Sequence, residues 1–284
     1  MLSPAQVAQY QEKGFLNAGF AVPAGEVDRL RAELERVLQN AGGPGPQPVL
    51  CHNMSKNPAQ PVWQIVNIWQ ASPAFQKLLE NPVISGAAAQ LCAARELRIW
   101  HDQIQYKPAG VGGVNMWHQD SPYWAVLREK DQQITAWIAL DDVDASNGAM
   151  SMVPGSHRWG NQIAFLHTLK DFQAMPPEFQ GHPTPVELCP VKMGHVHFHH
   201  SLTWHGSQAN TSGRPRRAIA LHFMNERTTY TAQGEHPMKP FIHVAEGQPI
   251  IGEAFPKVWE NGATAGTAQG QHASADTHAA TGGR

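Results

Sequence analysis

The stretch QITAWIALDDV, residues 133–143, has the period of a β-strand. Two sets of residues alternate along it: Ile134, Ala136, Ile138 and Leu140 in one set, and Thr135, Trp137, Ala139 and Asp141 in the other. Successive side chains on a strand point to opposite faces. The alternation therefore predicts a strand here, and the sequence on both sides repeats the pattern.

Short, turn-bounded segments of the same kind begin near residue 95. They are ELRIWHDQIQYK, VNMWHQD, AMSMVPGSH, VELCPVKMGHVHFHH and RRAIALHFM, and Asn147-Gly148 has the composition of a hairpin turn. Strands at this spacing are typical of an antiparallel sandwich or barrel. We expect residues 95–261 to form such a core.

The first 94 residues carry helical signals instead. Helices are expected over residues 3–17, with Gly14 as a stop signal, over 24–40, and over 72–93 with an interruption at Pro82; the Gly- and Pro-rich residues 41–62 predict a loop. The small, polar residues 262–284 predict a disordered tail. The chain thus predicts one domain over residues 1–261, with N-terminal helices (1–94) ahead of the β core (95–261).

Composition narrows the class of protein. The chain has 284 residues, 42% of them hydrophobic, and a net charge of −2, so neither nucleic acid nor an anionic membrane is an expected partner. Cys51, Cys92 and Cys189 are far apart and odd in number, which suits a reducing cytoplasm. The first residues lack the apolar segment of a signal peptide, and no apolar run has the length of a membrane span. A small-molecule substrate is the expected partner, and the oligomeric state stays open.

The stretch WHQDSPYW, residues 117–124, places two metal-ligand side chains close together. On an extended strand, His118 and Asp120 would share one face. A catalytic metal needs a third ligand, because the 2-His-1-carboxylate arrangement uses three positions and leaves the others open. Candidates lie in residues 193–224, which contain His195, His197, His199, His200, His205 and His222. Spacing alone does not choose among these histidines.

Three motifs in order resemble the phytanoyl-CoA dioxygenase family: HQD at 118–120, NGAMSMVPGSH at 147–157 and HGSQANTSGRPRRA at 205–218. The resemblance spans roughly residues 5–230. It implies an Fe(II)- and 2-oxoglutarate-dependent oxygenase on a double-stranded β-helix, that is, a jelly-roll or cupin-like barrel. It further implies that His118, Asp120 and His205 hold iron, that Arg216 binds the far carboxylate of 2-oxoglutarate, and that Ser207, Trp137 and Gln103 touch this cosubstrate.

The chemistry of a buried anion supports the role of the arginine. A carboxylate inside a barrel needs a counter-charge, and Arg supplies a permanent one with two parallel donors. Arg216 and Arg217 are adjacent, so on a strand they point oppositely; the resemblance selects Arg216, and Arg217 is expected to face solvent. Arg214 precedes a proline and is expected in a turn.

Two local features bear on the iron site. In this family an acidic residue often follows the glycine at 194, whereas this chain has His195; His195, His197 and His199 could add polar lining, and their role stays open. Asp120 is present, and halogenases of this superfamily lack that carboxylate. Halogenation is therefore disfavoured.

The expected reaction is hydroxylation of an unactivated C–H bond of a small organic or natural-product-like substrate, with O2 consumed and succinate and CO2 released. Tyr123 and Trp124 would form an aromatic wall, and Asn67, Trp69 and His101 would add contacts from outside the barrel. No cluster of Lys and Arg stands ready for the nucleotide of an acyl-CoA.

Two other functions remain open from the sequence. The same iron site could support desaturation, epimerisation or ring formation. Alternatively, the chain could be a non-catalytic, metal-binding cupin-like module, although such a module has no need of Arg216. A serine hydrolase is disfavoured because no GxSxG elbow occurs.

Overall fold

The computed structural model describes residues 1–53 and 62–261, so the tail expected over 262–284 lies outside the described residues. Their strands form one large sheet, in the order β1-β11-β6-β13-β4-β3-β2 with β14 also paired to β4, and a smaller sheet in the order β10-β7-β12-β5. The large sheet comprises β1 (Phe15–Ala21), β2 (Leu50–Asn53), β3 (Trp63–Val66), β4 (Glu96–Lys107), β6 (Gln133–Ala139), β11 (His195–His200), β13 (Arg216–Asn225) and β14 (Lys257–Glu260). The small sheet comprises β5 (Asn115–His118), β7 (Met150–Met152), β10 (Glu187–Cys189) and β12 (His205–Ser207), and β8 (Glu178–Phe179) pairs with β9 (His182–Pro183).

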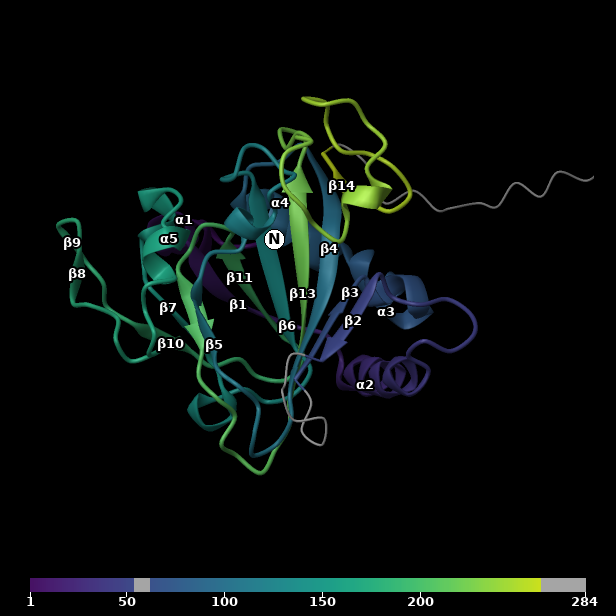
Figure 1. Ribbon diagram of the computed structural model, residues 1–284, viewed down its shortest axis with the longest axis horizontal. Coiled ribbons are helices and arrows are strands. Elements are labelled where there is room, and N and C mark those ends of the chain that lie inside the picture. The colour runs from purple at the N-terminus through teal and green to yellow at the C-terminus, as the bar shows by residue number, and fades with distance from the viewer. Residues whose placement is uncertain (54–61, 262–284) are drawn as a thin grey trace, which may run out of the picture.

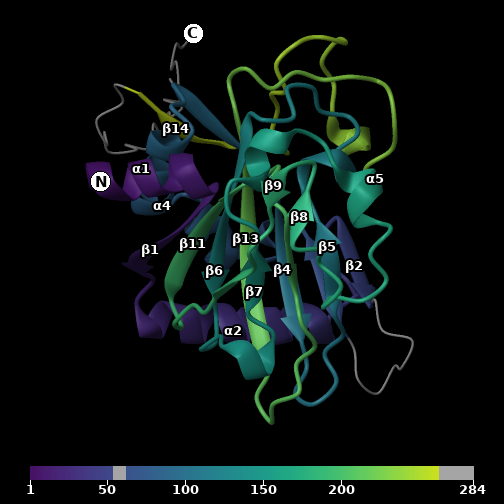
Figure 2. The ribbon, with the colours of Figure 1, turned by 90° about the vertical axis from the view of Figure 1, so that its left-hand side faces the viewer.

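The chain passes repeatedly between the two sheets from β4 to β13. Strands β4, β6, β11 and β13 belong to the large sheet, and β5, β7, β10 and β12 between them belong to the small one. Figures 1 and 2 show the small sheet standing in front of one face of the large sheet. This winding is a double-stranded β-helix, and it confirms the predicted jelly-roll core.

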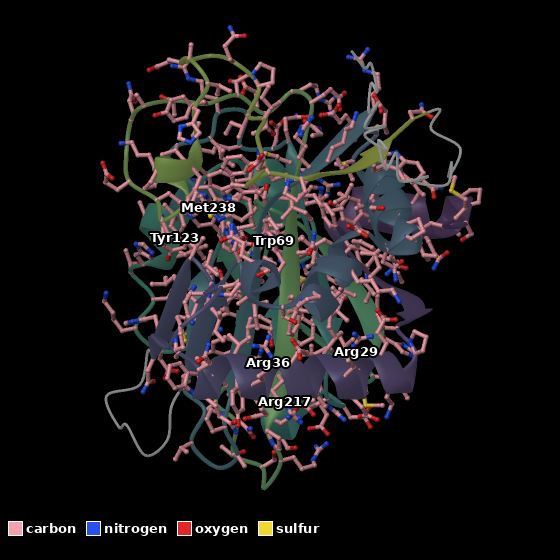
Figure 3. All side chains as sticks on the ribbon, turned by 90° about the vertical axis from the view of Figure 1, so that its right-hand side faces the viewer. Arg29, Arg36, Trp69, Tyr123, Arg217 and Met238 are labelled. Atoms are coloured by element: carbon pink, nitrogen blue, oxygen red, sulfur yellow. The ribbon has the colours of Figure 1, made fainter. Side chains whose placement is uncertain are left out.

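Four helices cover the other face of the large sheet: α1 (Pro4–Lys13), α2 (Ala24–Gln39), α3 (Pro73–Leu79) and α4 (Pro82–Leu91). The short helix α5 (Ile163–Leu166) instead packs on the small sheet, where Leu166 shares a core cluster with Trp117 of β5. The 3-10 turns are η1 (Ile68–Ala71), η2 (Ser121–Tyr123), η3 (Ala145–Asn147), η4 (Ser156–Trp159) and η5 (Lys239–Phe241). Helix α2 runs across the outer face of the large sheet (Figure 3). Its residues Leu30 and Leu34 share one core cluster with Ile134 and Ile138 of β6. No helix among the described residues is long and apolar enough to span a bilayer.

The alternation in β6 therefore separates two environments. Its aliphatic set faces the helices, and the set containing Thr135 and Trp137 faces the small sheet, where both side chains line the space between the sheets. Arg217 lies on the helix side of β13 (Figure 3), as its alternation with Arg216 predicted. It is not a solvent-facing charge, however: its side chain is 17% exposed and forms two hydrogen bonds with Asp141.

The N-terminal part contributes strands as well as helices, contrary to the expectation of helices alone. The first helix ends at Lys13, and β1 follows at once and pairs with β11. Part of the expected loop over 41–62 is strand β2, which pairs with β3. The break at Pro82 is confirmed, because α3 ends at Leu79 and α4 starts at Pro82.

The hairpin expected at Asn147-Gly148 is wrong. Gly148 does have a positive φ of 87° after the turn η3. Strands β6 and β7 on either side nevertheless belong to different sheets. The turn therefore carries the chain from one sheet to the other, because a jelly roll places consecutive strands in opposite layers.

Candidate active site

Two histidines meet across the small sheet. His118 ends β5 and is paired directly with His205 at the start of β12, with ring centroids 4.1 Å apart. The Nδ1 atom of His118 lies 2.7 Å from the carbonyl oxygen of Met116, and that of His205 lies 2.9 Å from the carbonyl of Thr203. A carbonyl oxygen only accepts, so each Nδ1 carries the proton. Each Nε2 is therefore left with a free lone pair for a metal.

Asp120 completes the group, but not in the way the extended strand predicted. Strand β5 ends at His118, and Asp120 has helical backbone angles (φ −71°, ψ −53°) at the start of η2. A bond from its amide to the carbonyl of Ser201, 2.9 Å long, fixes the turn. Its Oδ1 atom then lies 3.5 Å from Nε2 of His205 and 3.8 Å from Nε2 of His118.

These three side chains can hold one metal ion. One ligand atom from each lies within 4.8 Å of the others. Ligand atoms about 2.1 Å from a common ion and at right angles are about 3 Å apart, so only a small contraction is needed. Two imidazoles and one carboxylate on one side, with the remaining positions open, form the donor set that suits Fe(II) in oxygenases.

The electrostatics keep His118 and Asp120 in their metal-binding forms, whereas the neighbouring Asp120 outweighs burial and raises the pKa of His205. Burial lowers the pKa of His118 to about 3, so its imidazole is neutral. Burial alone would raise the pKa of Asp120, but the neighbouring His205 and His199 outweigh it and hold that pKa well below its usual range. A neutral imidazole and an ionised carboxylate are the forms that bind metal.

Arg216 places a buried positive charge beside this group. Its side chain is fully buried on β13, and among the described residues neither its Nε nor its Nη1 atom has a hydrogen-bond partner. Its Nη2 atom lies 3.4 Å from Oγ of Ser207, and its guanidinium carbon lies 5.6 Å from the ring centre of Trp137. A buried cation with unused donors is costly in isolation and fits the carboxylate of a ligand.

Lys107 is a second buried basic residue, which was not predicted from the sequence. It is paired with Arg216 across β4 and β13, and its Nζ atom lies 2.7 Å from Oγ of Ser207. Burial and then the charge of Arg216 lower its pKa to about 6. A signal was present in the sequence: His101, Gln103, Gln105 and Lys107 alternate along β4, so they share one face, and that face is polar from 101 to 107.

A cavity of about 980 Å³ opens beside the ligand group. The expected residues Gln103, His101, Tyr123 and Trp124 line it together with His118, Asp120, Arg216 and Lys107. A small space between the sheets, lined by Ser207 and Trp137, also reaches the three ligands. The structure thus brings the metal-ligand group, the two buried basic side chains and the aromatic wall to one place.

Two of the expected substrate contacts lie outside the lining of this cavity. Neither Asn67 nor Trp69 lines the cavity. Asn67 is fully buried, and its Oδ1 atom accepts from the amide of Asp102 at 3.2 Å. The amide of Trp69 donates to the Asp102 carboxylate at 3.2 Å. These residues stabilise the turn after β3, where Asn67 adopts a left-handed backbone with φ of 55°.

Two further imidazoles line the cavity and were not among the expected substrate contacts. The ring of His101 lies 4.6 Å from that of His222 on β13 and 5.3 Å from that of His236, in the segment after β13. Burial lowers the pKa of His101 to about 3 and that of His236 to about 4. This wall is therefore rich in nitrogen but uncharged at neutral pH.

The histidines of β11 have separate environments. His199 is buried, and its Nε2 atom lies 3.1 Å from Oδ2 of Asp120. His197 is buried, and neither of its ring nitrogens has a hydrogen-bond partner among the described residues. His195 is half-buried, and His200 lies on the other face with its ring 5.2 Å from that of His157. None of these four belongs to the metal-ligand group found among the described residues.

Comparison with known proteins agrees with this geometry. A family model described as phytanoyl-CoA dioxygenase (PhyH) matches residues 10–218. Ectoine dioxygenase of Bordetella parapertussis is 28% identical over 245 residues, which cover 80% of this chain and 77% of that protein. The solved structure of the non-heme alpha ketoglutarate dependent carbocyclase SnoK from nogalamycin biosynthesis is 30% identical, with a TM-score of 0.72, over 91% of this chain and 97% of that one.

A more distant solved structure shares the fold. EctD from S. alaskensis with 2-oxoglutarate and 5-hydroxyectoine is 21% identical, with a TM-score of 0.62, and the match covers 81% of this chain and 78% of that one. The family model covers well over half of the present chain. The chain therefore belongs to the phytanoyl-CoA dioxygenase family of iron- and 2-oxoglutarate-dependent oxygenases.

Proposed function

We propose that this oxygenase hydroxylates an unactivated C–H bond of a small organic, natural-product-like substrate and releases succinate and CO2. The observation that carries the proposal is the fully buried Arg216, which lies in the same cavity wall as His118 and Asp120 and has two donor atoms with no partner in the described part of the chain. A binding module without 2-oxoglutarate would carry the cost of that buried charge with no compensating ligand.

Each side chain has a role in this proposal. His118, Asp120 and His205 would hold iron through two Nε2 atoms and one carboxylate oxygen. Arg216 would grip the far carboxylate of 2-oxoglutarate, and Ser207 would add a hydroxyl that Lys107 already contacts at 2.7 Å. Trp137 and Gln103 would flank the cosubstrate.

When bound, iron and 2-oxoglutarate supply oxidative decarboxylation with O2, removal of one hydrogen atom from the substrate and return of a hydroxyl group. The protein supplies position and exclusion of water. Trp124 is 4% exposed and Trp137 is 1% exposed, so both shield the reacting centre. Tyr123, whose hydroxyl lies 2.9 Å from Nε2 of His167, would close the outer side of the cavity.

The cavity supports a neutral substrate with hydrogen-bonding oxygen or nitrogen atoms. Its imidazole wall of His101, His222 and His236 is uncharged, and the aromatic wall of Tyr123 and Trp124 offers apolar surface. Apart from the buried pair Arg216 and Lys107, Lys170 is the lining cation among the described residues, which is too little charge for the phosphates of coenzyme A.

A second outcome at the same site is ring formation or epimerisation, and the similarity to the carbocyclase favours ring formation over desaturation. Product analysis separates these outcomes. A hydroxylated product gains one oxygen atom, a ring-closed product loses two hydrogen atoms, and an epimer keeps the composition of the substrate.

An anaerobic titration tests the proposal. The protein is titrated with Fe(II) and then 2-oxoglutarate, and the visible charge-transfer band of the chelate is followed. We expect the band in wild type and its loss in Asp120→Ala and His205→Ala. Metal binding without the band would favour the non-catalytic module instead, and succinate release in the presence of candidate compounds would then identify the substrate.

The location of the enzyme is proposed on the cysteines. Cys51, Cys92 and Cys189 are all free thiols. Free thiols persist in a reducing compartment. We therefore propose that the enzyme works in the cytoplasm.

A further inference from the structure

Three polar side chains form a row across the large sheet, opposite the metal-ligand group. Thr135 on β6 is paired with His199 on β11 and with His222 on β13. All three are buried, with exposed fractions of 0%, 2% and 3%, respectively, and all line the small space between the sheets. Buried polar groups in such a position need hydrogen-bond partners.

Two members of the row hold the same carboxylate oxygen. Oγ of Thr135 donates to Oδ2 of Asp120 at 3.1 Å, and Nε2 of His199 lies 3.1 Å from the same atom. Because an ionised carboxylate only accepts, His199 carries its proton on Nε2. The other oxygen, Oδ1, faces the Nε2 atoms of His118 and His205.

The third member fixes the direction of the threonine hydroxyl. Nδ1 of His222 lies 2.8 Å from Oγ of Thr135. The single hydrogen of Thr135 is used toward Asp120, so Nδ1 of His222 must donate to Oγ. His222 also lines the large cavity, and it thereby links the cavity wall to the carboxylate.

We infer that His199 and Thr135, with His222 behind Thr135, are positioning residues that hold Oδ2 of Asp120 away from the metal so that Oδ1 alone binds it. The inference rests on the proposed function of Asp120 as a metal ligand. A carboxylate that bound through both oxygens would occupy one more position, and the reaction needs that position for 2-oxoglutarate or O2. Hydrogen bonds to ligating carboxylates typically change metal affinity by about 10–100-fold.

The test measures Co(II) binding to the metal-free protein by competition with a coloured chelator, and records the visible absorption of bound Co(II), which reports its coordination number. Thr135→Val and His199→Leu each remove one hydrogen bond, and we expect each to weaken Co(II) binding about tenfold and to change the absorption. Thr135→Ser keeps the hydroxyl and His199→Gln keeps a donor amide, so both should restore binding toward wild type.

His197→Leu is the matched control. His197 lies on the same strand as His199 and is equally buried, but it has no hydrogen bond to Asp120. The His197→Leu variant should therefore bind Co(II) with the affinity and absorption of wild type. Equal loss in the control would mean that packing of β11, and not the hydrogen bond, sets the affinity, and this result would overturn the inference.

The possible failures are distinguishable. If Thr135→Val and His199→Leu bind Co(II) with wild-type affinity and absorption, and Asp120→Ala does not bind it, the positioning role is overturned but the metal site stands. Unchanged Co(II) binding in Asp120→Ala would instead refute the metal site itself, and with it the proposed function. Thermal unfolding of each variant checks that the fold is retained. If Thr135→Val or His199→Leu unfolds the protein, Thr135→Ser and His199→Gln are compared with wild type instead.

Discussion

Nζ of Lys107 lies 2.7 Å from Oγ of Ser207, and Nη2 of Arg216 lies 3.4 Å from the same oxygen. Two buried basic side chains thus meet at one hydroxyl inside the barrel. Among residues 1–53 and 62–261, no carboxylate lies within ion-pair distance of either side chain. Burial and then the charge of Arg216 lower the pKa of Lys107, and a dicarboxylate bound between the two side chains would raise it.

Arg216→Gln should weaken 2-oxoglutarate binding selectively. The substitution removes the charge that pairs with the far carboxylate, and hydrogen bonds to charged groups contribute about 1.5–3 kcal/mol. We expect the KM for 2-oxoglutarate to rise about 10–100-fold, with Fe(II) binding retained because the three ligands are intact. Succinate release at varied 2-oxoglutarate concentration, together with metal content, provides the measurement.

Arg217→Gln is the control for that variant. Arg217 lies next to Arg216 on β13 but on the helix side, where it forms hydrogen bonds with Asp141 at 2.8 and 3.0 Å. Its loss should lower the free energy of unfolding and leave the KM for 2-oxoglutarate unchanged. A comparable rise in KM in both variants would argue that β13 is distorted and that the charge of Arg216 is not the cause.

Binding of 2-oxoglutarate should take up a proton through Lys107. With its pKa lowered to about 6, the Lys107 amine is largely unprotonated at pH 8 in the free protein. A neighbouring dianion favours the charged form and raises that pKa, so the amine gains a proton on binding. Calorimetry at pH 8 in buffers of different ionisation enthalpy should detect uptake of up to one proton per site.

Lys107→Met separates this source of protons from others. The methionine side chain is unbranched and only one atom shorter, but it cannot titrate, so the buffer dependence should disappear while weaker binding remains measurable. Proton release in wild type, or uptake of the same size in the variant, would contradict the assignment to Lys107.

Features that depend on local alternation could be predicted from the sequence. The alternation in residues 133–143 identified β6, and the adjacent arginines were assigned to opposite faces of β13, which the structure confirms. Both follow from the two-residue period of a strand. The same two-residue period places Lys107 on the polar inner face of β4 with His101 and Gln103, so its inward position could also have been predicted.

Features that depend on long-range pairing were not predictable in this way. The extended geometry assumed for Asp120 was wrong because a bond to Ser201, 81 positions away by number, turns the chain after β5. The contact between His199 and Asp120 joins the two sheets. Asn67 and Trp69 lie outside the cavity lining, in a turn whose backbone amides donate to the carboxylate of Asp102 on β4. No local pattern in the sequence encodes such contacts.

Gly14→Ala should destabilise the protein more than Gly19→Ala. Both glycines have positive φ, 82° and 68°, so each substitution costs about 1–2 kcal/mol of backbone strain. A Cβ atom at Gly14 would also lie 2.4 Å from Nδ1 of His157 and 2.7 Å from Oγ1 of Thr203, which adds about 1–3 kcal/mol. At Gly19 no atom of the described residues, its two chain neighbours apart, lies within 4 Å of that position.

Urea unfolding followed by tryptophan fluorescence measures this difference. The free energy of unfolding should fall by about 2–5 kcal/mol in Gly14→Ala and by about 1–2 kcal/mol in Gly19→Ala. Equal losses would show that the neighbouring side chains move aside without cost, so that backbone conformation alone requires glycine at position 14.

The imidazole wall should make substrate recognition insensitive to pH near neutrality. Burial lowers the pKa of His101 to about 3 and that of His236 to about 4, so both rings are neutral, and both gain a proton only as the pH falls toward those values. For a neutral substrate at saturating 2-oxoglutarate, where Lys107 is already paired, the KM should change by less than about twofold between pH 6 and pH 8.5. The contrary result is an acid limb in kcat/KM centred near the ordinary histidine pKa of about 6.5. If His101→Phe and His236→Phe both retain that limb, the titrating group lies elsewhere. If either variant loses the limb, the wall is charged in the working enzyme and selects an anionic substrate.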